Sequence, residues 1–167
     1  MIAEKESEKI VGKGRSLKSV SLEIGRALHM DARMSKFHFD AFVVSALVSM
    51  YRKHSQVENA WHAFNRAQYC NLVSRNILIA TFAEEKQPQK AFSLFYQILQ
   101  EGFIPNNSTF VAILEACASN LYHIESSHMH VQIVSTSFGN DVTLQTSLIH
   151  MYGKSGNVER AWNVFST

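Results

Sequence analysis

The sequence predicts an all-α protein in which antiparallel helical hairpins stack into an α-solenoid. The first observation is an internal repeat, because residues 47–64 (LVSMYRKHSQVENAWHAF) return at 148–165 (LIHMYGKSGNVERAWNVF), 101 residues further along the chain. The second is the helical spacing of three and four between apolar residues in each copy. The third is the distance itself: 101 residues is too long for one supersecondary unit, so the intervening sequence must hold further copies.

Shorter shifts locate those copies. A shift of 31 residues aligns 47–64 with 78–95, and a further shift of 35 aligns 78–79 with 113–114. The predicted units are a 31-residue repeat at 41–71, a 35-residue repeat at 72–106, a divergent 35-residue repeat at 107–141 and an incomplete repeat at 142–167. Residues 21–40 match the second half of the divergent repeat. Residues 1–20 match poorly and form a divergent amino-terminal segment, with order and disorder both left open.

Each repeat is predicted to hold two helices. The breaks inside the hairpins fall in polar stretches at 53–56, 85–88, 119–123 and 154–157, and Pro88 suits a first helical turn. The breaks between repeats fall at 101–107 and 136–141, where glycine and proline end one helix and asparagine or aspartate can cap the next. One hairpin cannot bury both of its faces, whereas stacked hairpins share a continuous core.

Composition narrows the function classes. The chain has 46% hydrophobic and 18% charged residues, which suits one folded domain, and its net charge of +2 does not by itself indicate a nucleic-acid partner. Cys70 and Cys117 form no CxxC pair and lie in apolar-periodic segments, so buried, reduced thiols are expected. No apolar run is long enough to span a bilayer, and no membrane partner is predicted.

The strings ALVSMYRKHSQVENAWHAF, NILIATFAEEKQPQKAFSLFYQILQEGFIPN and FVAILEACASN resemble the pentatricopeptide repeat family, and specifically its plant subclass that alternates standard, long and short repeats. The order short (41–71), standard (72–106), long (107–141) and incomplete short (142–167) follows that subclass. GRALH at 25–29 resembles the second helix of a preceding long repeat. The resemblance implies a right-handed superhelix that binds single-stranded RNA with one base per repeat. A protein-binding tetratricopeptide array is the nearest alternative.

The resemblance also implies which residues read the bases: one in the first helix of each repeat, and one at the end of the repeat. These are Ser45 with Asn71 in the short repeat and Asn76 with Asn106 in the standard repeat. By analogy with the family, the first pair favours adenine and the second a pyrimidine, cytosine more than uracil. Amides and hydroxyls have the defined donor and acceptor groups that such discrimination needs. The alternative is that these side chains are ordinary helix caps and turn formers.

The remaining repeats are expected to recognise bases less specifically. Val111 cannot make a specifying hydrogen bond, so its pairing with Asp141 is expected to read weakly. Thr146 favours a purine, and its closing partner would lie beyond Thr167. Phe42 and Val73 match family positions that sandwich neighbouring bases.

No catalytic residue, metal site, cofactor or small-molecule substrate is predicted. His123-Ile124-Glu125 fits half of a zinc deaminase signature, but the required P-C-x-x-C does not follow it. His128 and His130 are two residues apart and so lie on different faces of a helix.

Two classes of function follow. The first is a non-catalytic RNA-binding module resembling factors for RNA editing or RNA processing in the mitochondrion or chloroplast, although Glu4, Glu6 and Glu8 argue against a transit peptide here. The second is a protein-binding scaffold, or a degenerate fragment with no useful affinity for RNA. The chain stops within a predicted helix, so an exposed apolar face is expected there. Further repeats, other RNA-processing proteins or a second copy of the chain are its expected partners.

Overall fold

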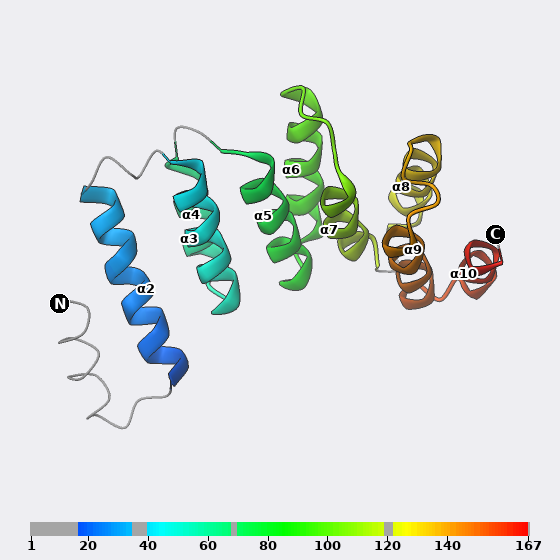
Figure 1. Ribbon diagram of the computed structural model, residues 1–167. Coiled ribbons are helices and arrows are strands. Elements are labelled where there is room, and N and C mark those ends of the chain that lie inside the picture. Colours follow the sequence, from blue (N-terminus) through cyan, green and yellow to red (C-terminus); the bar gives the residue numbers. More distant parts are fainter. Residues whose placement is uncertain (1–16, 35–39, 68–69, 119–121, 167) are drawn as a thin grey trace. The chain divides into compact units, whose positions relative to one another are not determined.

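The computed structural model describes residues 17–34, 40–67, 70–118 and 122–166, and every regular element within these ranges is an α-helix (Figure 1). None of these helices is long and apolar enough to cross a bilayer. The helices are α2 (Leu17–Met34), α3 (Ala41–Lys53), α4 (Val57–Asn65), α5 (Leu72–Glu84), α6 (Pro88–Gln100), α7 (Asn107–Cys117), α8 (His123–Ser135), α9 (Val142–Lys154) and α10 (Val158–Phe165).

Contacts divide the chain into two units, residues 1–78 (unit 1) and 79–167 (unit 2), with the boundary inside the continuous helix α5. In unit 1, α3 packs against both α2 and α4. In unit 2, α7 packs against α6, α8 and α9, while α9 also packs against α8 and α10. Within each unit, α3, α7, α8 and α9 therefore pack against helices that precede and follow them in the sequence, as the predicted stacking of hairpins requires.

The helix boundaries follow the predicted breaks. Helices α4 and α10 begin directly after the polar stretches 53–56 and 154–157, and α6 begins at Pro88, the last residue of the stretch 85–88. Helices α7 and α9 begin at the predicted junctions between repeats. One boundary differs: α2 begins at Leu17, so the division predicted between residues 20 and 21 falls inside a helix. Val20 is buried, which gives this first turn a packing role that comparison with the other repeats does not reveal. Residues 1–16 lie outside the described residues.

Three hairpin turns share one backbone conformation. Ser55, Lys86 and Gly156 occupy aligned positions and have positive φ angles of 52°, 56° and 76°. In each turn the next residue donates its N–H to a helical carbonyl, at 3.0, 2.8 and 2.9 Å respectively. This is the left-handed helix ending that glycine adopts most easily. Only the last copy has glycine there, so the turn is determined by its hydrogen bonds rather than by one residue type.

The repeated apolar stripe forms the core in some copies and is exposed in another. Phe64 and Phe95 are 5% and 0% exposed, whereas the aligned Phe165 is 69% exposed. Phe64 lies under the guanidinium of Arg75 from α5, 5.7 Å from the ring centre. Trp162 on α10 is exposed as well. The apolar face expected at the last helix is therefore present, and the next helix in the sequence covers the equivalent face of α4.

Only one of the two cysteines is buried as predicted. Cys117 is buried, as predicted, and burial together with the nearby Glu125 raises the pKa of its thiol to about 12. Cys70 is only half-buried, because it lies in the segment between α4 and α5, where its sulfur approaches the carbonyl of Phe64 at 3.5 Å. The thiol of Cys117 is therefore protonated and unreactive at neutral pH.

A histidine–tyrosine pair recurs at the 101-residue spacing. His29 Nδ1 lies 2.8 Å from the hydroxyl of Tyr51 in unit 1, and His130 Nδ1 lies 2.9 Å from that of Tyr152 in unit 2. The ring centres are 5.6 Å apart in both pairs. Each pair joins a second helix to the first helix of the following repeat. It is therefore a stacking contact between repeats.

The pair in unit 2 is expected to make stability depend on pH. Burial, and then the charge of Arg160, lower the pKa of His130 below its ordinary value, so the folded state holds this imidazole neutral. The unfolded chain binds the proton more readily, so the free energy of unfolding should fall as the pH drops below about 6.5. Urea denaturation followed by circular dichroism at pH 7.5 and 5.5 measures this fall. In His130→Gln, the loss between the two pH values should be smaller than in the wild type. An equal loss in both proteins would contradict the prediction.

Candidate nucleic-acid interface

The residues that close the repeats are all helix caps. Asp40, Asn71, Asn106 and Asp141 each lie directly before the first helix of the following repeat. A side-chain oxygen of each accepts a backbone N–H bond. The bonds measure 2.7, 2.9, 3.0 and 3.0 Å, from Phe42, Ser74, Thr109 and Leu144 respectively. All four closing residues therefore cap helices, and only the polar groups that capping leaves over can contact a ligand.

The two predicted base-reading residues of the short repeat are in direct contact. The hydroxyl of Ser45 on α3 lies 3.1 Å from Oδ1 of Asn71, and 2.8 Å from the carbonyl of Ala41. Because a hydroxyl donates one proton at a time, these two bonds alternate. Oδ1 of Asn71 also accepts the backbone N–H of Ser74. The Nδ2 group of Asn71, with two N–H donors, is the part of this side chain that neither the cap nor Ser45 uses.

The standard repeat has its two predicted residues in different units. Asn76, on the part of α5 that belongs to unit 1, is 8% exposed. Asn106 in unit 2 is exposed and forms a capping box, in which its Oδ1 accepts from Thr109 while the threonine hydroxyl accepts from the Asn106 backbone at 3.1 Å. Asn76 is therefore the more enclosed and Asn106 the more accessible of the two.

Asp141, the last residue of the predicted long repeat, is charged throughout the physiological range. Its bond from the Leu144 backbone, and then one from the Asn107 side chain, lower the pKa of the carboxyl. Asn107 is the first residue of α7, so the cap of α9 is linked to the preceding first helix. Asn107 was not among the predicted site residues, although NN at 106–107 could have suggested a second polar side chain at this junction.

The first-helix residues of the last two repeats differ in chemistry. Val111 on α7 is half-buried and offers no hydrogen bond. Thr146 on α9 is exposed, and its hydroxyl donates to the carbonyl of Val142 at 2.7 Å, which leaves its oxygen free to accept. Thr146 is therefore the more suitable of the two for a polar ligand.

The two predicted stacking residues are accessible. Phe42, at the start of α3, is 80% exposed and Val73, at the start of α5, is 56% exposed. Both belong to unit 1, on the first turns of helices that the polar side chains of Asp40 and Asn71 cap. An exposed aromatic ring beside polar caps is an arrangement suited to stacking against a base.

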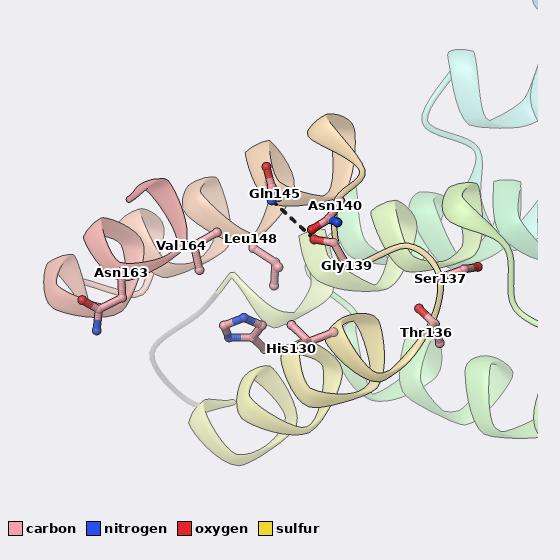
Figure 2. A pocket seen from close by; sticks show the side chains of 10 residues that line it. His130, Thr136, Ser137, Gly139, Asn140, Gln145, Leu148, Asn163 and Val164 are labelled. Carbon is pink, nitrogen blue, oxygen red and sulfur yellow. Dashed lines mark hydrogen bonds between the residues drawn. The ribbon is translucent and has the colours of Figure 1, made fainter. Parts of the chain in front are cut away.

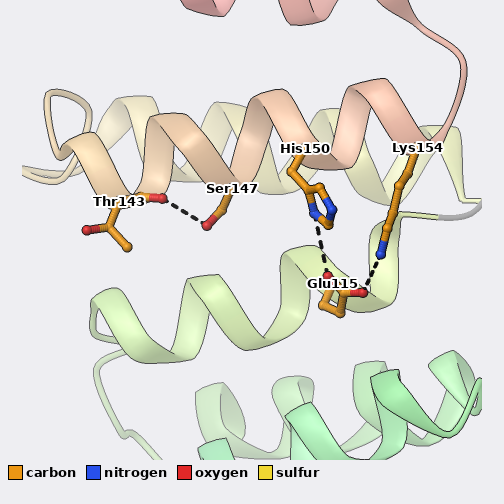
Figure 3. A network of polar contacts seen from close by, with 5 residues as sticks. All are labelled: Glu115, Thr143, Ser147, His150 and Lys154. Carbon is orange, nitrogen blue, oxygen red and sulfur yellow. Dashed lines mark hydrogen bonds and ion pairs between the residues drawn. The ribbon is translucent and has the colours of Figure 1, made fainter.

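A charged cluster lies further along the first helices of unit 2 (Figure 3). Glu115 on α7 contacts Lys154 on α9, with 2.7 Å between Nζ and Oε1. The imidazole of His150 lies 3.7 Å from the other carboxylate oxygen. None of these three residues was identified from the sequence. Spacings of four from Val111 to Glu115 and from Thr146 to His150 could have placed them beside the base-reading positions.

A hollow of ≈ 520 Å³ lies elsewhere in unit 2, between α8, α9 and α10 (Figure 2). His130 and Leu148 line it, and Gln145 donates from its amide to the carbonyl of Gly139 at 3.4 Å. None of the predicted base-reading residues lines this hollow. It is therefore separate from the candidate interface.

Comparison with known proteins gives matches along most of the chain. The family model described as the PPR repeat family matches residues 70–119, and the model described as PPR repeat matches residues 146–167. A chloroplastic pentatricopeptide repeat-containing protein of Arabidopsis thaliana is 36% identical over 152 residues, which cover 89% of this chain and 20% of that protein. A mitochondrial one is 32% identical over 146 residues, covering 86% of this chain and 26% of that protein.

A solved structure has a similar backbone. The crystal structure of the pentatricopeptide repeat protein PPR10 from maize matches with a TM-score of 0.73 at 14% identity, over 91% of this chain and 21% of that chain. This likeness confirms the predicted all-α solenoid class. The chain spans about a fifth of the length of the first curated relatives that it matches.

Proposed function

Because the chain belongs to the pentatricopeptide repeat family, we propose that it is a non-catalytic module that binds single-stranded RNA selectively, with one base per repeat. The observation that carries the proposal is the hydrogen bond between Ser45 and Asn71. These two residues are 26 positions apart, one on α3 and the other at the start of α5, yet their side chains are in contact. The contact leaves the Nδ2 group of Asn71 for a ligand. Ordinary capping needs only Asn71 and does not require Ser45 at this place.

The chemistry of this point supports recognition of adenine by the short repeat. The side-chain oxygen of Asn71 accepts a hydrogen bond from the Ser74 backbone, which leaves the two N–H donors of Nδ2 for a base. A base with an unprotonated ring nitrogen can accept such a donor, whereas a ring N–H would face it unfavourably. Adenine and cytosine both fit the first description, and the choice of adenine follows the analogy with the family. Asn76 and Asn106 supply amides for the next base, for which a pyrimidine is the family expectation.

The four predicted repeats differ in how strongly each is expected to recognise a base. We assign full base reading to the short and standard repeats, weak reading to Val111 with Asp141, and partial reading to Thr146. Base stacking contributes about 1–3 kcal/mol per base, whereas micromolar affinity needs about 8 kcal/mol. The module alone is therefore expected to bind weakly, and tight binding is expected only with further repeats or an additional module.

We further propose a role in RNA processing or editing in a mitochondrion or chloroplast, with the alternating plant-type arrangement of repeats. Support comes from the names of several relatives, which are chloroplastic or mitochondrial. The chemistry of editing is assigned to no residue of this chain.

Fluorescence anisotropy with a labelled single-stranded RNA containing 5′-A-C-N-R tests the base assignment. Ser45→Val introduces the residue found at the aligned position 111 and should reduce the preference for adenine at the first base. Asn76→Ser gives the standard repeat the serine and asparagine of the short repeat, so its preferred base should change from cytosine to adenine. Each change should be several-fold, since one hydrogen bond contributes about 1 kcal/mol.

Ser147→Val is the matched control. Its hydroxyl donates to a carbonyl one turn back at 2.8 Å, as that of Ser45 does, but it occupies no base-reading position. It should leave base preference unchanged. RNA affinity undetectable at high micromolar concentration, with no effect of any substitution, would refute the proposal in favour of a scaffold or a degenerate fragment.

A further inference from the structure

The contact between Glu115 and Lys154 joins two neighbouring first helices of unit 2, α7 and α9. Figure 3 shows Lys154 and His150 on one side of α9, both directed at the carboxylate of Glu115. The side chains of Glu115, Lys154 and His150 are 39%, 46% and 56% exposed. An external ion can therefore reach all three without unfolding any part of the unit.

The cluster lies on the same helix faces as two base-reading positions. Glu115 follows Val111 by four residues on α7, while His150 and Lys154 follow Thr146 by four and eight on α9. Side chains four residues apart project from one side of a helix. An RNA strand whose bases meet Val111 and Thr146 would therefore have its backbone within reach of these charges.

The cluster also borders an open hollow. Glu115 and Lys154 line a hollow of ≈ 550 Å³ in unit 2, together with Lys86 and Tyr122. Lys86 is a second amino group that faces the same space. An anionic group entering the hollow would meet both amino groups, but it would also meet the carboxylate of Glu115.

We propose that Glu115 is an internal counter-ion that competes with RNA phosphate for Lys154 and so lowers the affinity of this face for RNA. This inference rests on the proposed function. Phosphates bind lysine by displacing small counter-ions, and the gain in affinity comes from their release. Glu115 is a counter-ion that cannot be released because it is covalently part of the chain. When a phosphate takes Lys154, the carboxylate stays beside it and repels it.

The consequence concerns salt as well as affinity. In the wild-type protein Glu115 already neutralises Lys154. Binding of an RNA phosphate to Lys154 therefore releases few salt ions. In Glu115→Gln the ammonium group gathers salt ions that a phosphate can displace. One additional phosphate contact steepens the dependence of log affinity on log salt concentration by about 0.7 for a single strand.

The test is a set of anisotropy titrations with the same labelled RNA at several salt concentrations. Glu115→Gln should tighten binding by about three- to tenfold at low salt and steepen the salt dependence. Lys154→Gln in the Glu115→Gln background should remove both gains. Glu159→Gln, which removes one negative charge from α10, is the matched control for net charge and should change affinity by less than about twofold.

The outcomes separate this inference from the proposed function. If wild-type protein selects bases but Glu115→Gln binds no more tightly, the counter-ion role is wrong and base reading stands. If Glu159→Gln tightens binding as much as Glu115→Gln, the effect is one of net charge. If the double variant does so, the gain does not depend on Lys154, and either result shows that the pairing with Lys154 is wrong. A gain that depends on Lys154, without base selectivity, supports the counter-ion and refutes base reading. Absence of RNA binding by every variant overturns both.

Discussion

Asn71→Asp should change the preferred base of the short repeat from adenine to guanine, by about tenfold. The substitution keeps the cap oxygen that Ser74 and Ser45 contact, but replaces the N–H donors of Asn71 with a second acceptor. A base that offers donors on its pairing edge then fits better than one with an unprotonated ring nitrogen. Guanine presents such donors. A net change of about 1.4 kcal/mol corresponds to the tenfold factor.

The measurement compares anisotropy for RNAs that carry each of the four bases at the first position. Asparagine and aspartate are equally good caps, so Asn71→Asp should unfold at nearly the same urea concentration as the wild type. Asn71→Ala should lose both base preference and about 1 kcal/mol of stability. Asn157→Asp is the matched control, because this cap accepts from Arg160 at 3.1 Å inside a hairpin and closes no repeat. Unchanged base preference in a stable Asn71→Asp protein would mean that Asn71 is only a cap.

Phe95→Ala should lower the free energy of unfolding of unit 2 by about 3–5 kcal/mol. Phe95 is fully buried on α6, and its ring centre lies 6.4 Å from that of Phe110 on α7. Truncation removes the ring and leaves a cavity between these two helices, which close packing cannot fill without moving a helix. The contact between neighbouring repeats would be weakened at its centre.

The same substitution at the aligned position provides the control. Phe165 belongs to the same sequence stripe but is 69% exposed, so Phe165→Ala should cost less than about 1 kcal/mol. Urea denaturation followed by circular dichroism measures both variants. If both variants lost the same free energy of unfolding, the position in the repeat, and not the burial of the ring, would determine the loss.

Much of the fold could be predicted because the repeats share one pattern. The spacing of three and four located the helices, and the polar stretches located the turns, including Pro88 at the start of α6. Local hydrogen bonding determines these features, so they can be read from neighbouring residues. The start of α2 at Leu17 was missed because its first turn has no clear counterpart in the other repeats, and only burial of Val20 reveals its role.

The candidate site was predictable to a smaller extent. Alignment indicated Ser45 and Asn71 together, and the structure brings them to 3.1 Å. The sequence could not show that Oδ1 of Asn71 is engaged by the protein while Nδ2 is left over, because this depends on the orientation of one amide. Nor could it show the contact of Glu115 with Lys154, whose partners are 39 residues apart and belong to different repeats. The contact between Asp141 and Asn107 was missed as well, because it joins the first and last residues of the predicted repeat at 107–141 and so depends on how that repeat folds back on itself.

The sequence by itself determined the family and the helical hairpins, because these follow from periodic apolar residues and local turn chemistry. Tertiary structure alone decided what each repeated residue does. Phe95 and Phe165 are the same residue at the same repeat position, yet one is core and the other surface. The physical reason is that burial and charge pairing depend on the next helix in the stack. A repeat does not contain the helix that covers it.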